Sequence, residues 1–131
     1  MTRAVLEGVA YGMRDSLEIM RGMGVAVSEI RASGGGARSP LWRQMMADTA
    51  KAPMVTINVD EGPAYGAAIL ASVAAGMYKT VEEGCDAIIE EISRLESDAA
   101  AVETYEKWFS EYQAMYGALA PRFRALSGLL G

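Results

Sequence analysis

The feature that most constrains the fold of this chain is a run of three glycines, Gly34, Gly35 and Gly36. An apolar segment over residues 25–32 leads into the run and predicts a strand. A helix is expected to follow, because Ser39-Pro40 suits an N-cap and a first helical position. Glycines let backbone approach a flat or charged ligand, and the helix N-terminus attracts anions. The unit therefore suits a nucleotide, although a flexible turn explains the motif equally well.

Helical spacing predicts two long amphipathic helices, at Thr2–Gly22 and at about residues 102–126. We expect the apolar stripe of the first to form one face, made of Val5, Val9, Met13, Leu17 and Met20. The stripe of the second alternates spacings of three and four: Val102, Tyr105, Phe109, Tyr112, Tyr116, Leu119, Phe123 and Leu126. It could pair with another helix, but packing within one domain is the favoured interpretation. Pro121 should kink or break this helix.

The middle of the chain predicts shorter elements. The helix that starts at Ser39-Pro40 must stop before Pro53, and Met54 to Val59 then predicts a strand. A turn at residues 60–63 opens a helix over residues 64–76 with a nearly all-small surface, which suits close approach to a neighbour. Thr80 and Glu83 form a capping box for a helix to about residue 92. Two strands make a marginal sheet, so we expect a helix-rich α/β fold that is part of a larger domain.

Composition excludes several classes of protein. The formal net charge is −5 and no block of Lys or Arg occurs, which argues against nucleic-acid and anionic-membrane partners. The chain has no histidine, and a lone Cys85 allows no internal disulfide, so the cytoplasm is the expected compartment. No apolar run approaches the roughly 18 residues of a membrane span. No catalytic triad or metal-spaced cluster is present, so we assign no catalytic and no metal-binding residue.

A second motif begins at Asp60-Glu61-Gly62-Pro63 and runs to Ala68. Two carboxylates at a helix start favour the helix dipole, which is a more economical explanation than catalysis. The glycine run is neither a Walker A motif nor a dinucleotide-binding fingerprint, because it lacks Gly-Lys-Ser/Thr and Gly-x-Gly-x-x-Gly.

Taken together, the two motifs resemble those of the FGGY family of carbohydrate kinases. The segment Arg31 to Gln44 is similar to the family's adenosine motif, and Asp48 follows where many members have an aspartate. Residues 61–68 resemble the Gly-Pro-Ala-x-Gly-Ala-Ala run of xylulose kinases in particular. Residues 2–8 look like the end of a family signature, and the last helix resembles the family's closing helix.

This resemblance implies an actin-like ATPase (ribonuclease H-like) fold. It implies that residues 1–131 form the C-terminal portion of the kinase C-terminal domain, the adenosine-binding half, without the N-terminal domain. The implied activity is transfer of the ATP γ-phosphate to a hydroxyl of a pentulose, with D-xylulose the expected sugar. The implied cofactors are ATP and Mg²⁺, and the implied nucleotide-binding residues are Gly34, Gly35, Gly36, Ala37, Ser39 and Pro40.

The family's catalytic aspartate, phosphate motif and Mg²⁺ carboxylates precede the part of the family to which this chain corresponds. We therefore expect the chain to be inactive alone, with the sugar bound through the absent part. We also expect a homo-oligomer, because a partial sheet leaves faces without neighbours. The alternative is a stand-alone, non-catalytic oligomeric module derived from such a kinase. Another actin-like kinase, for acetate or a hexose, is disfavoured by the run at residues 62–68.

Overall fold

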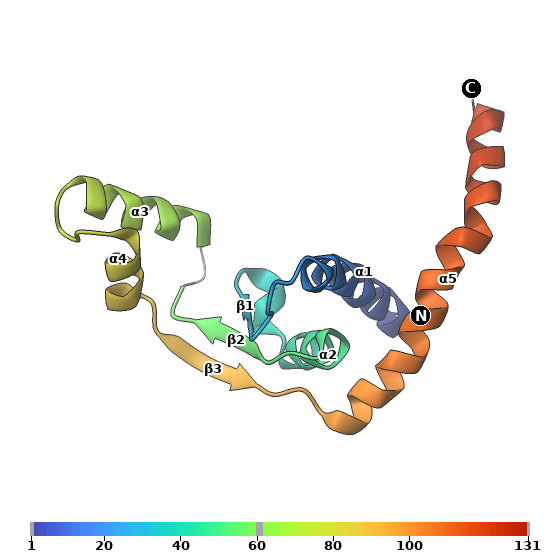
Figure 1. Cartoon of the computed structure of the whole chain (residues 1–131), viewed down its shortest axis with the longest axis horizontal. Coiled ribbons are helices and arrows are strands. Elements are labelled where there is room, and N and C mark those ends of the chain that lie inside the picture. The colour runs from blue at the N-terminus through green and yellow to red at the C-terminus, as the bar shows by residue number, and fades with distance from the viewer. Residues whose placement is uncertain (1, 60–61, 131) are drawn as a thin grey trace.

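The computed structural model describes residues 2–59 and 62–130 (Figure 1). The elements follow in the order α1 (Thr2–Gly22), β1 (Ile30–Ala32), a 3-10 turn (Gly35–Arg38), α2 (Pro40–Ala50), β2 (Met54–Ile57), α3 (Gly62–Ala74), α4 (Val81–Ile88), β3 (Glu91–Leu95) and α5 (Ala99–Leu130). Within this part of the chain, no helix combines the length and the apolarity needed to span a membrane.

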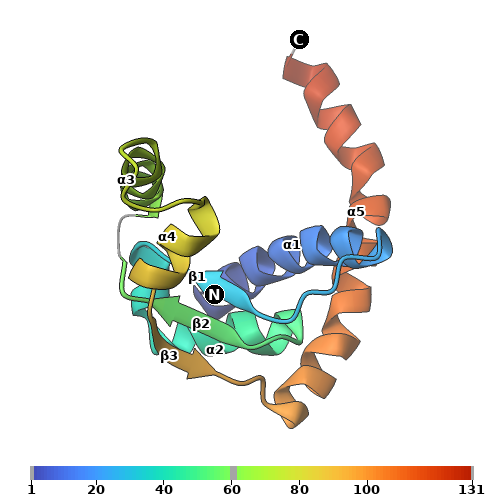
Figure 2. The same ribbon diagram turned by 60° about the vertical axis from the view of Figure 1, so that its left-hand side comes forward.

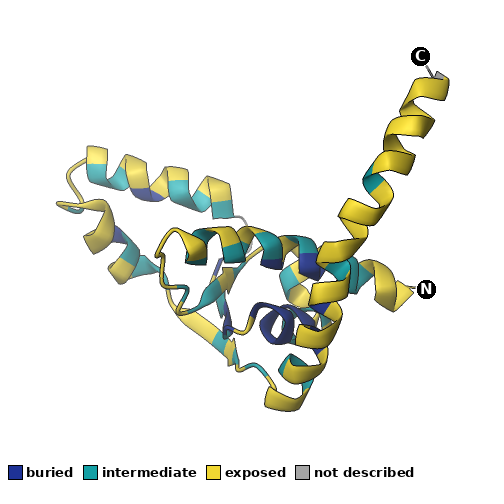
Figure 3. Ribbon diagram, turned by 45° about the vertical axis from the view of Figure 1, so that its right-hand side comes forward, coloured by how far each residue is buried: buried dark blue, intermediate teal, exposed yellow. Residues whose placement is uncertain are grey.

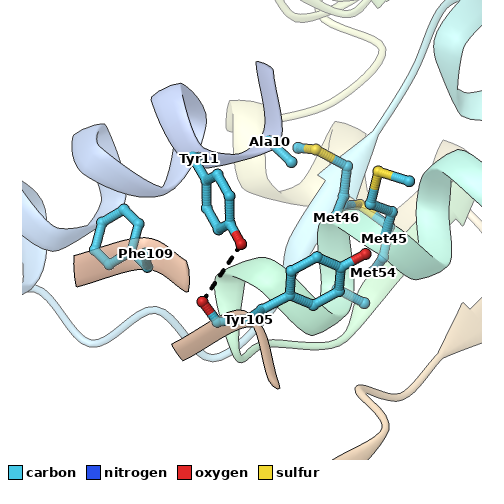
Figure 4. Close-up of a cluster of buried hydrophobic side chains, with 8 residues drawn as sticks. Ala10, Tyr11, Met45, Met46, Met54, Tyr105 and Phe109 are labelled. Carbon is cyan, nitrogen blue, oxygen red and sulfur yellow. Dashed lines mark hydrogen bonds between the residues drawn. The ribbon is translucent and has the colours of Figure 1, made fainter. Parts of the chain in front are cut away.

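Helix α2 is the centre of the structure. It contacts α1, α5, β2 and β3, and its residues from Met45 to Ala50 are all buried. The core consists of side chains from four elements that meet here (Figure 4): Ala10 and Tyr11 of α1, Met45, Met46 and Ala47 of α2, Met54 of β2, and Tyr105 and Phe109 of α5. The Tyr11 hydroxyl donates to the backbone carbonyl of Tyr105 at 3.5 Å, so the polar end of a buried ring is satisfied. Burial raises the pKa of Tyr11 to about 12.

The sheet has three strands in the order β1-β2-β3, so the expectation of two strands is wrong. Strand β1 is parallel to β2, and β3 is antiparallel to β2, with Thr56 facing Ala32 on one side and Ser93 on the other. The helix expected to run to about residue 92 ends at Ile88, and Glu91 to Leu95 pairs with β2 instead. The first strand is also shorter than expected. It covers Ile30–Ala32 instead of residues 25–32, because only Ile30 to Ala32 pair with β2.

Helix α1 has the expected bounds but buries a different face. Ala10, Tyr11 and Arg14 face α2 and α5, whereas Val5, Val9 and Met13 of the apolar stripe are exposed. Helical periodicity groups side chains on a face but does not say which neighbour that face meets. The structure therefore leaves an apolar face of α1 without a neighbour among the described residues.

A charged cluster joins α1, α2 and α5 beside the core. Arg14 is only 2% exposed, and its guanidinium lies 3.9 Å from the Phe109 ring centroid. It donates to Glu106 at 2.7 Å and to Glu18 at 3.3 Å, and Lys51 also pairs with Glu106 at 2.8 Å. The hydrogen bond from Lys51, reinforced by that from Arg14, lowers the pKa of Glu106 below its usual range. This cluster fixes the angle at which α5 leaves the core.

The two ends of the structure extend away from that core. Helices α3 and α4 pack on each other at one end, and the far half of α5 projects at the other (Figures 1 and 2). The alanines of α3 are exposed, so among the described residues they do not make the close approach expected of them. Helix α5 continues through Pro121 to Leu130 instead of breaking. Its stripe packs in the core only as far as Tyr112, and Tyr116, Leu119, Phe123 and Leu126 are exposed (Figure 3).

Candidate nucleotide-binding loop

The glycine run forms the expected tight connection between β1 and α2. Gly34 has φ +80°, a conformation that strains residues with a Cβ, and a 3-10 turn over Gly35–Arg38 follows. Ser39 then caps α2: its hydroxyl accepts from the Trp42 N–H at 3.3 Å, and Pro40 is the first helical residue. The predicted N-cap is therefore confirmed. Because Pro40 has no N–H and the Trp42 N–H is capped, the first turn keeps few of the unpaired N–H groups usual at a helix start.

The three glycines differ in how far the structure explains them. Gly34 is required by its positive φ. A Cβ at Gly36 would lie 3.3 Å from the Trp42 indole Nε1, so a side chain there is accommodated only if Trp42 moves by a few tenths of an ångström. A Cβ at Gly35 would meet no atom within 4 Å among the described residues beyond its immediate neighbours, and its φ is not positive. The described part of the chain thus gives no internal reason for glycine at position 35.

The loop presents an exposed surface. Gly35, Gly36, Ser39 and Pro40 are exposed, while Gly34 and Ala37 are partly buried. The six residues predicted to bind nucleotide therefore lie together on one connection, and most of them are open to a ligand.

The second motif meets the first beside this loop. Gly62 opens α3, and a Cβ on it would lie 3.4 Å from the Ser33 Oγ. Residues separated by almost thirty positions thus come into van der Waals contact directly before the glycines. Asp60 and Glu61, which we interpreted as helix-start charges, lie outside the described residues.

Arg43 lies beneath the loop and was not assigned a role from the sequence. Its Nη1 donates to the Ser93 Oγ at 2.6 Å and reaches the Thr56 Oγ1 at 3.5 Å, and these hydroxyls are 2.7 Å apart. Sequence reasoning missed the group because it missed β3, which carries Ser93. The strand signal was weak, because Ile92 and Leu95 are three positions apart and do not alternate with polar residues at the period of two that a strand favours.

Other candidate residues have structural roles. Asp48 is buried, and its carboxylate accepts from the Gln44 amide and from the backbone N–H of Asp98, both at 2.8 Å. It thereby joins α2 to the start of α5. Cys85 is a free, partly buried thiol on α4. In residues 2–59 and 62–130, no cluster of three or more acidic or cysteine side chains is placed to hold a metal ion.

Comparison with known proteins agrees with this geometry. Residues 1–75 match the C-terminal domain of the FGGY family of carbohydrate kinases. The xylulose kinase of Staphylococcus epidermidis is 39% identical over 114 residues, which are 87% of this chain and 23% of that protein. The crystal structure of xylulose kinase from Rhodospirillum rubrum aligns over 93% of this chain with a TM-score of 0.80 and 30% identity. Gluconate kinase from Lactobacillus acidophilus aligns over 92% with a TM-score of 0.83 and 26% identity.

The fold and the glycine loop thus define part of an actin-like ATPase domain of the sugar-kinase type. More particularly, the chain belongs to the FGGY family of carbohydrate kinases. It spans about a quarter of the length of the relatives it matches, 23% for the Staphylococcus epidermidis protein and 25% for the Rhodospirillum rubrum chain.

Proposed function

We propose that this chain forms the adenosine side of the ATP site in an ATP-dependent sugar kinase. The observation that carries the proposal is Gly35, an exposed glycine whose missing side chain no described internal contact explains. A ligand that needs close approach to the backbone is a physical reason for a glycine there. The adjacent α2 N-terminus adds the partial positive charge of its helix dipole, which favours a phosphate nearby.

The six loop residues have distinct parts in this proposal. The backbone of Gly34, Gly35, Gly36 and Ala37 lies against the α-phosphate and adenine. Ser39 and Pro40 border the adenine at the start of α2. Because the Ser39 hydroxyl already caps the helix at the Trp42 N–H, its contribution to the nucleotide comes mainly from shape.

The rest of the ATP site belongs to the remainder of the kinase in this proposal. Mg²⁺ is the metal we propose for the family's reaction, but the described residues do not fit a Mg²⁺ site, since they contain no cluster of candidate ligands. We therefore assign this chain no catalytic step. Residues 1–131 act as the C-terminal portion of the C-terminal domain and contribute to nucleotide binding only.

For the substrate, we propose a pentulose, with D-xylulose as the sugar. The support comes from the names of the relatives, of which the Staphylococcus epidermidis protein is a xylulose kinase. A gluconate kinase shares this fold with a TM-score of 0.83, so the described segment alone does not select the sugar. We place the kinase in the cytoplasm, which suits its free Cys85.

We also propose that the chain forms homo-oligomers. The far half of α5 exposes an apolar seam in which Tyr116 is 74% exposed and Phe123 49%. Helices in proteins owe most of their stability to packing of an apolar face, so this half favours a partner. Its alternating three- and four-residue spacing suits a second helix, such as α5 of another copy. This surface also supports the alternative of a stand-alone oligomeric module.

The test of the nucleotide proposal is Gly35→Val in the full-length kinase that contains this segment. We expect ATP affinity to fall by about tenfold or more, with sugar affinity and thermal stability nearly unchanged. The matched control is Leu41→Val, an exposed apolar position on the first turn of α2, which should leave ATP affinity unchanged. Equal ATP affinity in the wild type and Gly35→Val would identify the loop as a structural turn.

A further inference from the structure

The arginine beneath the glycine loop has contacts that the proposed nucleotide site does not use. Arg43 is partly buried on the first turn of α2, where its backbone N–H donates to the Ser39 carbonyl at 3.0 Å. Its side chain reaches in the other direction, to Ser93 and Thr56 on the sheet. One residue thus connects the N-cap of α2 to the β2–β3 pair.

The acceptors of Arg43 are unusual for a half-buried cation. Within the described residues they are the hydroxyls of Ser93 and Thr56, and no carboxylate pairs with the guanidinium. Its Nε is buried and has no hydrogen-bond partner among the described residues. A buried guanidinium nitrogen without a partner is costly, so simple stabilisation does not explain this arginine well.

The position of Arg43 relative to the loop supplies the second observation. Two small cavities, about 360 Å³ and 280 Å³, lie at the base of the loop, and Arg43 lines both. Ser33 and Ala37, at the two ends of the glycine run, line both cavities as well. The loop is therefore not packed tightly on the sheet, and the Arg43 side chain bridges the gap between them.

The strand register completes the connection. Thr56 of β2 faces Ala32 of β1, the last residue before Ser33, and it also faces Ser93 of β3. The chain enters the loop from β1 and leaves it into α2. Arg43 therefore links the exit of the loop to the strand beside its entrance, which limits how far the loop can shift over the cavities.

We propose that Arg43 is a positioning residue that holds the glycine loop in the geometry needed to bind ATP. The inference rests on the proposed function of the loop. It assigns Arg43 no contact with the nucleotide. The Arg43 side chain acts through the first turn of α2 and the hydroxyl pair on β2 and β3.

The test uses Arg43→Gln in the full-length kinase, with KM for ATP and KM for the sugar measured separately. We expect KM for ATP to rise by about tenfold, while KM for the sugar changes by less than about twofold. Arg43→Lys should restore part of the loss, because it keeps the charge and one donor. The matched control is Arg94→Gln on β3, whose partners are Glu29, Glu91 and Glu96, and its KM for ATP should equal that of the wild type.

A second variant keeps the test decisive if Arg43→Gln folds poorly. Ser93→Ala removes the closest acceptor and leaves the arginine, so a smaller rise in KM for ATP supports the inference. Amide hydrogen exchange in residues 34–37 should accelerate in Arg43→Gln, whereas exchange in the α1–α2 core should not. Weak ATP binding by Gly35→Val together with unchanged ATP binding by Arg43→Gln and Ser93→Ala would overturn the role of Arg43 alone. Unchanged binding by all three would remove the nucleotide proposal itself.

Discussion

Gly36 lies directly against Trp42, so close that a Cβ on the glycine would stand 3.3 Å from the indole Nε1 and 3.4 Å from Cδ1. The contact joins the glycine loop to the first turn of α2. It distinguishes Gly36, where packing against Trp42 disfavours a side chain, from Gly35, where no such contact is present among the described residues. Substitutions at these two neighbouring glycines are therefore expected to change stability by different amounts.

We expect Gly36→Ala to destabilise the chain by roughly 1 kcal/mol, because the added methyl group must displace the Trp42 ring. Gly35→Ala should change stability by less than about 0.5 kcal/mol. Urea unfolding of the 131-residue chain measures both, and a Trp108→Phe background makes fluorescence report on Trp42. Equal stabilities of the two variants would contradict the distinction drawn here.

Tyr11 should make stability depend on pH in the alkaline range. Burial raises its pKa from 10.0 to about 12, so the folded state holds the proton more tightly than the unfolded state. Its contribution is complete below pH 10 and is lost as the pH rises through 12, by roughly 3 kcal/mol in all. Tyr11→Phe should therefore flatten the dependence of unfolding free energy on pH.

The control for this titration is Tyr116→Phe, which alters a tyrosine that is 74% exposed. It should keep the alkaline slope of the wild type. A Tyr11→Phe variant with the same slope as the wild type would show that Tyr11 is not the responsible group.

Arg14 should matter more for stability than any surface ion pair of the chain. Arg14→Met keeps an apolar contact with Phe109 but removes the bonds to Glu106 and Glu18, and we expect a loss of roughly 2 kcal/mol. Lys107→Met, which breaks an exposed pair with Glu103, should cost less than about 0.5 kcal/mol. Denaturant titrations compare the two variants. Similar losses of unfolding free energy would mean that the Arg14 cluster contributes no more to stability than an exposed ion pair.

We expect the 131-residue chain to show no sugar-kinase turnover by itself. Phosphoryl transfer depends on positioned metal ions and on a base for the sugar hydroxyl, and the described residues offer no metal site. A coupled assay for ADP release with D-xylulose measures this. Turnover at a rate typical of kinases would contradict two proposals: that the catalytic groups belong to other parts of the kinase, and that this chain contributes to nucleotide binding only.

Self-association should depend on the projecting half of α5. Light scattering from about 1 to about 100 µM should show species larger than a monomer, by mass action. Leu119→Ser combined with Phe123→Ser should shift the chain towards monomer. Ala114→Ser combined with Ala125→Ser lies at exposed positions off the seam and lowers helix propensity at least as much, yet it should not shift the chain towards monomer. If light scattering gave the mass of a monomer for the wild-type chain at every concentration, the proposed oligomer would be excluded.

Local interactions account for the parts that the sequence determined. The bounds of α1 and the start of α2 at Ser39-Pro40 were predicted correctly, because a helix start is encoded by residues within one turn of each other. The loop between β1 and α2 was also predicted, because a glycine run between two regular elements has few alternatives. The sequence alone likewise placed the six candidate nucleotide-binding residues on this loop.

Long-range contacts decided the rest. The strand β3 exists because Ser93 and its neighbours pair with β2, almost forty residues away, and no local pattern in residues 91–95 was strong enough to override the helical signal before it. The face of α1 that is buried depends on where α2 and α5 pack, so periodicity could not select it. Only the tertiary structure shows that Gly36 packs against Trp42 and that Gly35 makes no such contact. It also shows that the Arg43 side chain reaches the sheet. Each of these relationships depends on distances between elements.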